Sequence, residues 1–240
     1  MFEALVEAVQ DSVKTEVVEI GGENFVTRPV YRVPDEDIEN INALKINTLA
    51  GVVDYLQKNA NQIDGHATEK LIIHVANARK VAVYSQLDKR RRDCFLLAEL
   101  PNKSFSFDSY QEIEQFIVEL QTRFAKTPDS EKITQIVGNL TEEDVKTLAD
   151  DGFSQGVTVK TGIVKREDVK VKNPFTLQPF RTFLEVEQPE SDFIFRLRQR
   201  VGSLPQVALF EADGGKWELE AIAKIKAYLK DKLPDIPIVA

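Results

Sequence analysis

One catalytic pattern occurs in the sequence. Residues 152–156 read GFSQG and match G-x-S-x-G, the turn that carries the nucleophilic serine of α/β-hydrolases. In those enzymes the serine stands between a strand and a helix, and a histidine later in the chain deprotonates it. Here residues 157–160 favour a strand, and both histidines, His66 and His74, precede Ser154. We therefore interpret the match as a glycine-flanked turn that enters a strand.

Metal and phosphate chemistry find little support. A structural zinc site takes four Cys or His ligands, and the chain has one Cys and two His. The glycines form neither G-x-G-x-x-G nor a P-loop. Carboxylate sites for magnesium stay open as alternatives to turns, caps and exposed strand faces. The candidates are Asp150 with Asp151, Glu185 with Glu187, Glu211 with Asp213, and Asp129 with Asp168 and Lys170. We expect a non-enzymatic protein without metal or cofactor.

Arginines are the more informative residues. Lys89 and three arginines after it lie between two predicted strands, which favours an exposed hairpin tip. In the strand over residues 193–197 and just beyond, a period of two places alternate arginines on one face. Arg181 lies between Phe180 and Phe183, a setting that favours a stacked or bidentate arginine at a contact surface. The candidate contact surface is therefore Arg90, Arg91, Arg92, Arg181, Arg196, Arg198 and Arg200.

The charge distribution suggests a partner for these arginines. The chain has 31 Lys and Arg against 39 Asp and Glu, a formal charge of −8. Its first sixty residues hold 5 basic and 11 acidic residues, a local charge of 5 − 11 = −6. We favour pairing of the arginines with acids on another subunit. Binding of nucleic acid or a nucleotide, and a plain contribution to solubility, are the alternatives, although the acidic total argues against indiscriminate nucleic-acid binding.

The compartment follows from simple counts. Cys94 has no partner for an intrachain disulfide, which fits a reducing compartment. The first residues carry acids and no basic segment, unlike a signal peptide. No stretch approaches the roughly 18 uncharged apolar residues of a membrane span. We expect a cytoplasmic protein with no membrane partner.

Hydrophobic periodicity predicts the elements that position these residues. We expect helices over residues 2–13, from Leu49 after a Thr48 cap, over 109–125 with Asp108 or Ser109 as the cap, from about 141, and over 216–233. We expect strands over residues 16–20, 25–30, 71–76, 81–86, 94–100, 156–164, 169–171, 175–186, 193–197 and 207–211. The apolar residues 236–240 predict a strand docked in a sheet or against a neighbouring subunit.

These elements define an α+β fold with mixed or antiparallel sheets, three to five helices, and an extended N-terminal helix-and-hairpin arm. We expect a single domain over residues 1–240. A weak seam near residues 127–129 would divide it into lobes of residues 1–127 and 128–240. No internal repeat or low-complexity linker is visible in the sequence.

Several strings resemble a family of phage and prophage proteins without an assigned activity, typified by the cryptic-prophage protein YfdQ. The strings span most of the chain and occur in the same order as in the family. They are TLAGVVDY at 48–55, DDGFSQGVT at 150–158, NPF at 173–175, QPFRTF at 178–183, EQPESDF at 187–193 and ALFEADGGKW at 208–217. The resemblance implies a bacteriophage or prophage origin and a bacterial cytoplasm. It implies no catalytic residue.

Our leading hypothesis is a non-enzymatic phage protein that self-assembles into a homo-oligomer in an assembly or accessory role. It rests on the acidic N-terminal segment, the basic strand, the apolar C-terminal residues and the N-terminal arm. The first alternative is a nucleic-acid-binding accessory of phage replication or recombination. The second is a counter-defence protein that binds a host protein or a nucleotide. A magnesium-dependent nuclease ranks last.

Overall fold

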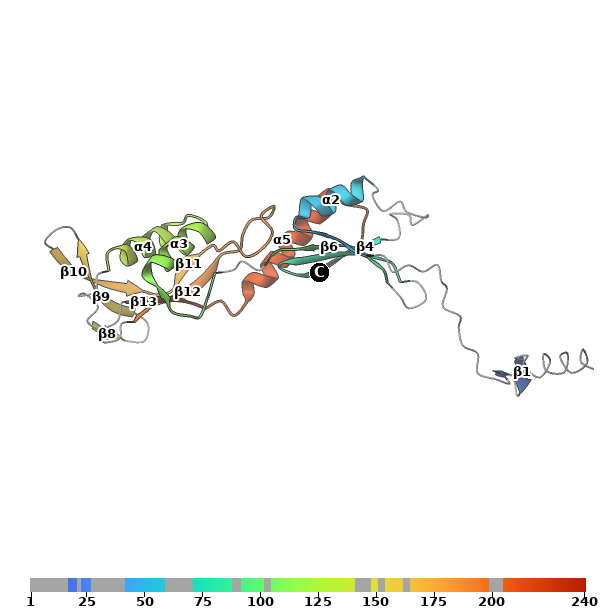
Figure 1. Ribbon diagram of the computed structural model, residues 1–240, viewed down its shortest axis with the longest axis horizontal. Coiled ribbons are helices and arrows are strands. Elements are labelled where there is room, and N and C mark those ends of the chain that lie inside the picture. Colours follow the sequence, from blue (N-terminus) through green and yellow to red (C-terminus); the bar gives the residue numbers. More distant parts are fainter. Residues whose placement is uncertain are drawn as a thin grey trace, which may run out of the picture. The chain divides into compact units, whose positions relative to one another are not determined.

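The computed structural model describes ten stretches of the chain (Figure 1). They are residues 17–20, 23–26, 42–58, 71–87, 92–101, 105–140, 148–150, 154–161, 165–198 and 205–240. Contacts divide the chain into two compact units, residues 1–40 and 41–240. The helices predicted over residues 2–13 and from about 141 lie outside the described residues.

The described part of the N-terminal unit is a β-hairpin. Strands β1 (Val17–Ile20) and β2 (Glu23–Val26) pair antiparallel, with Ile20 opposite Glu23. Only Gly21 and Gly22 separate the strands, so the connection is shorter than the four residues we predicted. The side chains of Val17, Val18 and Ile20 are 67%, 40% and 63% exposed. The hairpin thus presents apolar surface to solvent.

The second unit contains a five-stranded sheet in the order β14-β4-β5-β6-β3. Strands β4 (Leu71–Asn77), β5 (Lys80–Ser85) and β6 (Cys94–Glu99) confirm the three predicted strands, and they pair as an antiparallel meander. β3 (Leu44–Ile46) lies parallel to β6, and β14 (Ile238–Val239) lies parallel to β4. The predicted docking of the last residues as a strand is therefore confirmed.

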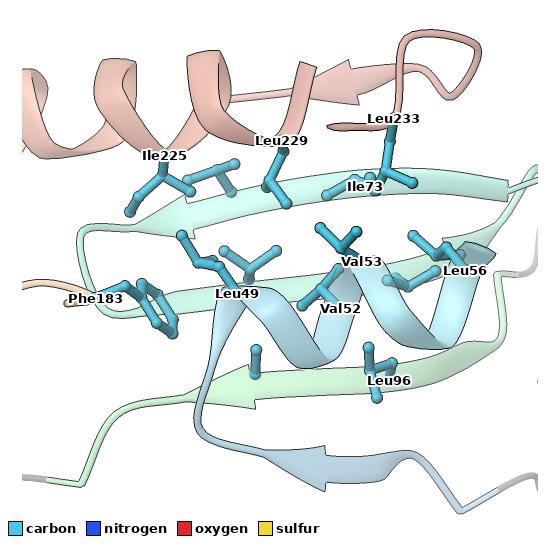
Figure 2. Packing of buried hydrophobic residues seen from close by; sticks show 14 of the residues in the cluster. Leu49, Val52, Val53, Leu56, Ile73, Leu96, Phe183, Ile225, Leu229 and Leu233 are labelled. Atoms are coloured by element: carbon cyan, nitrogen blue, oxygen red, sulfur yellow. The ribbon is translucent and has the colours of Figure 1, made fainter. Parts of the chain in front are cut away.

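Helices α2 (Leu49–Gln57) and α5 (Lys216–Lys232) pack against this sheet, and Figure 2 shows their apolar side chains meeting those of the strands. The Thr48 hydroxyl accepts a hydrogen bond from the Gly51 N–H at 3.1 Å, which confirms the predicted cap. Gly214 and Gly215, with φ of 64° and 82°, turn the chain into α5. The spacing of apolar residues along 216–233 predicts Leu219 on the buried side of this helix, but Leu219 is 71% exposed, so that prediction is wrong.

A second sheet has its own core in the same unit. Strands β7 (Gln111–Glu112), β11 (Phe175–Leu177), β12 (Ser191–Arg198) and β13 (Gln206–Glu211) pair antiparallel in the order β11-β12-β13-β7. Helices α3 (Ile113–Arg123) and α4 (Pro128–Gly138) cover one face of it (Figure 1). The largest side chains of this core are four fully buried phenylalanines: Phe116, Phe175, Phe193 and Phe195.

The sequence did not predict helix α4. Thr127-Pro128 reads as a break in the chain, yet it is a helix start with proline in the first turn. Helices on both sides of the predicted seam, α3 and α4, pack into the one core of this sheet. The predicted cap of α3 is also wrong: Asp108 has a φ of 58°, and the helix begins at Ile113 because the residues before it pair with β13 as strand β7.

The strand predicted over residues 175–186 is much shorter in the structure, whereas the strand predicted from residue 156 is present. The strand expected over residues 175–186 ends at Leu177, because the chain then leaves the sheet as a loop that runs to β12. A third sheet, in the order β10-β9-β8, comprises β8 (Leu148–Asp150), β9 (Ser154–Thr161) and β10 (Lys165–Lys172). Ser154 opens strand β9 and no helix follows it, which agrees with our interpretation of the G-x-S-x-G match.

The class is α+β, with four helices and mixed or antiparallel sheets in the described residues. None of these helices has both the length and the apolar composition that crossing a bilayer requires.

The start of α4 yields a first prediction. The Thr127 hydroxyl accepts from the Ser130 N–H at 3.1 Å, and the Ser130 hydroxyl accepts from the Thr127 N–H at 2.9 Å. Thr127→Ala removes one half of this box, so we expect the free energy of unfolding to fall by about 1 kcal/mol in urea denaturation. The control is Thr122→Ala on the exposed side of α3, which we expect to change it by less than about 0.5 kcal/mol. Equal effects of the two substitutions would contradict a capping role.

Candidate contact surface

The predicted arginine row is positioned by strand β12. Its residues alternate between buried and more exposed positions, and Phe193, Phe195 and Leu197 point into the core beneath α3 and α4. Arg196 and Arg198 therefore lie on the opposite face of the sheet. This confirms the alternation predicted from the sequence.

Aromatic side chains accompany the arginines on this face. The guanidinium carbon of Arg198 lies 3.7 Å from the centroid of the Tyr110 ring. Its Nε and Nη2 donate to Oε1 of Gln206 at 3.2 and 3.0 Å. The rings of Tyr110 and Phe210 meet edge to face, with centroids 5.9 Å apart. Arg198 is thus held flat against a tyrosine by a stacking contact and a fork of hydrogen bonds.

We call this surface the arginine face. Its members are Tyr110, Ile194, Arg196, Arg198, Gln206 and Phe210. Ile194 lies directly opposite Phe210 on the neighbouring strand, and the members other than Arg198, which is exposed, are partly exposed. Apolar, aromatic and cationic side chains thus share one accessible sheet surface. The exposed carboxylates of Asp192 in β12 and Glu112 in β7 lie on the same side of the sheet.

Of the remaining predicted arginines, Arg92 and Arg181 are described by the structure, and neither joins this face. Arg90, Arg91 and Arg200 lie outside the described residues. Arg92 lies just before β6 of the five-stranded sheet and donates from Nη1 to the Ser85 carbonyl oxygen at 3.2 Å. Among the described arginines of the predicted set, the structure brings together Arg196 and Arg198.

The prediction that Arg181 lies on a contact surface is wrong. The structure buries Arg181, which is only 6% exposed. Its guanidinium carbon lies 3.9 Å from the centroid of the Trp217 ring and 5.4 and 5.6 Å from those of Phe107 and Phe193. The predicted stacking is present, but the rings come from distant parts of the chain and not from Phe180 and Phe183.

Two acids and a hydroxyl surround the Arg181 guanidinium, which donates to Oε1 of Glu211 and to Oγ of Ser191. Burial lowers the pKa of Arg181, and the charges of Glu211 and Asp213 oppose that shift. Burial likewise raises the pKa of Glu211 against the pull of Arg181. For Asp213 burial acts upward, but hydrogen bonds from Ser191 and the Gly215 N–H, with the charge of Arg181, hold the pKa below its usual value. The group is a structural anchor between β13, the start of α5 and the loop after β11, with one guanidinium between two carboxylates.

A buried glutamine fixes the same loop. Oε1 of Gln188 accepts from the backbone N–H groups of Arg181 and Thr182 at 3.0 and 3.1 Å. Its Nε2 donates to the carbonyl oxygens of Phe183 and Val186 at 3.0 and 3.2 Å. One side chain thus replaces the hydrogen bonds that a strand or helix would supply to this segment.

This arrangement makes Gln188→Ala a strong perturbation. Four buried backbone groups each lose a hydrogen bond, and we expect the free energy of unfolding to fall by about 2 kcal/mol in urea denaturation. The matched control is Gln206→Ala, where the glutamine bonds to Arg198 on a partly exposed face; we expect a loss below about 0.5 kcal/mol. A Gln188→Ala variant as stable as the native chain would show that the loop does not depend on this side chain.

The carboxylates considered for magnesium are engaged elsewhere. Oε1 of Glu185 accepts from the Ala50 N–H at 3.1 Å, and Oε2 of Glu187 lies 2.9 Å from Nζ of Lys224. Oδ2 of Asp129 accepts from the Thr176 N–H at 2.9 Å. Asp151 lies outside the described residues. Among the residues that the structure describes, no group of three or more His, Cys, Asp or Glu is placed to hold a metal ion.

Sequence reasoning missed both aromatic members of the arginine face. Phe210 was within reach, because Val207 and Leu209 are the core positions of β13 and the alternation places Phe210 on the other side. Tyr110 had no such signal, since it was assigned to a helix that begins only at Ile113. Comparison of the chain with protein-family models, with curated proteins and with solved structures gave no match.

Proposed function

We propose that the protein is non-enzymatic, serves a bacteriophage or prophage in the bacterial cytoplasm, and self-associates into a homo-oligomer through the arginine face. The observation that carries the proposal is Arg198 stacked on Tyr110, with Phe210 and Ile194 beside them, on the sheet face that α3 and α4 leave uncovered. Tyrosine, phenylalanine and arginine are the residues that protein interfaces enrich. The chemistry of this face therefore suits a protein partner.

The N-terminal unit supports a partner from the same chain. Residues 1–40 contain 3 Lys and Arg and 10 Asp and Glu, a charge of 3 − 10 = −7, so the other 200 residues carry −8 + 7 = −1. Its described hairpin exposes Val17, Val18 and Ile20. A two-stranded hairpin is at best marginally stable in water and needs a surface to pack on. The acidic unit with its exposed apolar hairpin therefore complements a surface on which arginines lie beside apolar side chains.

Sedimentation velocity of the full chain over a range of micromolar concentrations tests the proposal. We expect a mass that is a multiple of 27.1 kDa and that falls as salt is raised, because screening weakens contacts between exposed charges. A mass of 27.1 kDa at every concentration and at low salt would refute self-association.

Single-stranded nucleic acid is a second candidate for the arginine face. Exposed aromatic rings beside arginines are the usual platform on which bases stack. Arg198, however, already lies on the Tyr110 ring, so a base would have to displace it. Fluorescence anisotropy with a labelled oligonucleotide at low salt decides this: binding that weakens steeply with salt and is lost on Arg198→Ala would support it.

A further inference from the structure

We infer that the arginine face receives the N-terminal β-hairpin of a second copy of the chain. The inference rests on the proposed self-association and names the segment that makes the contact. It assigns a role to the exposed apolar residues of β1, which are Val17, Val18 and Ile20.

The hairpin has one face whose composition matches. Val18 and Ile20 are two residues apart in β1 and therefore share a face, and Glu23 lies directly opposite Ile20 on β2. All three are exposed. This face of the hairpin thus offers two apolar side chains bounded by a carboxylate.

The arginine face offers the reciprocal pattern. Ile194 and Phe210 lie opposite each other on β12 and β13, and Arg196 and Arg198 follow Ile194 on the same side of β12. Apolar contact between the two faces would place the Glu23 carboxylate within the reach of an arginine. Charge-assisted pairing of arginine with carboxylate is directional, so it would fix the register of the contact.

Charge and exposed apolar side chains together favour this occupant. The unit that contains the hairpin carries −7, and its strand β1 exposes Val17, Val18 and Ile20. Nucleic acid would supply charge but would leave Val18 and Ile20 exposed. The five-stranded sheet has a second partly exposed face with Ile72, Tyr84 and Leu97, which makes it the natural competitor as a docking surface.

Photo-cross-linking in mixed oligomers tests the inference. Val18 is replaced by p-benzoylphenylalanine in the full chain, isotopically heavy and light copies are mixed, and cross-linked peptides are identified by mass spectrometry after irradiation. We expect links between heavy and light chains that join the hairpin to peptides containing Tyr110, β12 or β13. The same group at Ile20 is a second probe, and at exposed Leu87, beyond the end of β5, it is the control without such links.

The outcomes separate this inference from the proposed function. A protein that sediments as a monomer refutes both. An oligomer whose hairpin links only within a single copy, or only to β4, β5 and β6, or to neither sheet, refutes the inference and leaves self-association intact. Only links between copies to the arginine face support the inference.

Discussion

Replacing Arg181 with alanine is expected to lower the free energy of unfolding by about 3 kcal/mol, measured by urea denaturation. The substitution leaves the Glu211 carboxylate and the Ser191 hydroxyl without the guanidinium to which they bond. It also removes the cation from the faces of Trp217 and Phe107. Losing one partner of a buried ion pair costs about 3–5 kcal/mol, and we expect the lower end because the Glu211 side chain is 30% exposed.

An exposed ion pair provides the control for this variant. Nζ of Lys126 lies 3.0 Å from a carboxylate oxygen of Glu131, and the Lys126 side chain is largely exposed. Lys126→Ala is expected to change the free energy of unfolding by less than about 1 kcal/mol, because water and salt screen such pairs. If Arg181→Ala cost no more than this control, the Arg181 cluster would not be the anchor we describe.

Reversing the charge of both described arginines of the arginine face, Arg196→Glu with Arg198→Glu, is expected to weaken self-association by roughly 100-fold or more. Like charges brought together at a contact cost several kcal/mol, whereas the same side chains contribute little to the core of their own chain. We therefore expect a higher dissociation constant in sedimentation velocity, with an unchanged circular dichroism spectrum.

A second double variant controls for net charge. Lys45→Glu with Lys226→Glu makes the same change in formal charge, −8 − 4 = −12, at two exposed lysines outside the arginine face. We expect this control to associate nearly as the native chain does. Equal weakening by the two variants would mean that total charge, and not the arginine face, governs association.

Much of the five-stranded half was predictable from the sequence because its signals are local. Thr48 caps α2, the glycines before Lys216 turn the chain into α5, and three apolar runs form β4, β5 and β6. The missed elements depend instead on contacts between distant segments. Thr127-Pro128 marks either a helix start or a break, and only the packing of α4 beside α3 decides between them.

The candidate site divides in the same way. Period two within β12 predicts that Arg196 and Arg198 lie opposite the phenylalanines, since adjacent residues of a strand face opposite sides. Tyr110 joins them because the next residue, Gln111, pairs with Val207 where β7 meets β13. These two residues are far apart in the sequence, so no local pattern predicts the contact. Arg181 was placed on the surface because Trp217 and Phe107, which bury it, are remote in sequence.

Mixing two charge-reversed variants tests the central claim most directly. One carries Arg196→Glu and Arg198→Glu; the other carries Glu23→Arg, which reverses the carboxylate on the hairpin face that Val18 and Ile20 share. Each variant alone sets like charges against each other at the proposed contact, whereas in a mixture every contact between unlike copies pairs opposite charges. We predict that each variant alone sediments as a monomer of 27.1 kDa and that the mixture regains the mass of the native oligomer. A mixture that stays monomeric while the native chain associates would contradict docking of the hairpin on the arginine face.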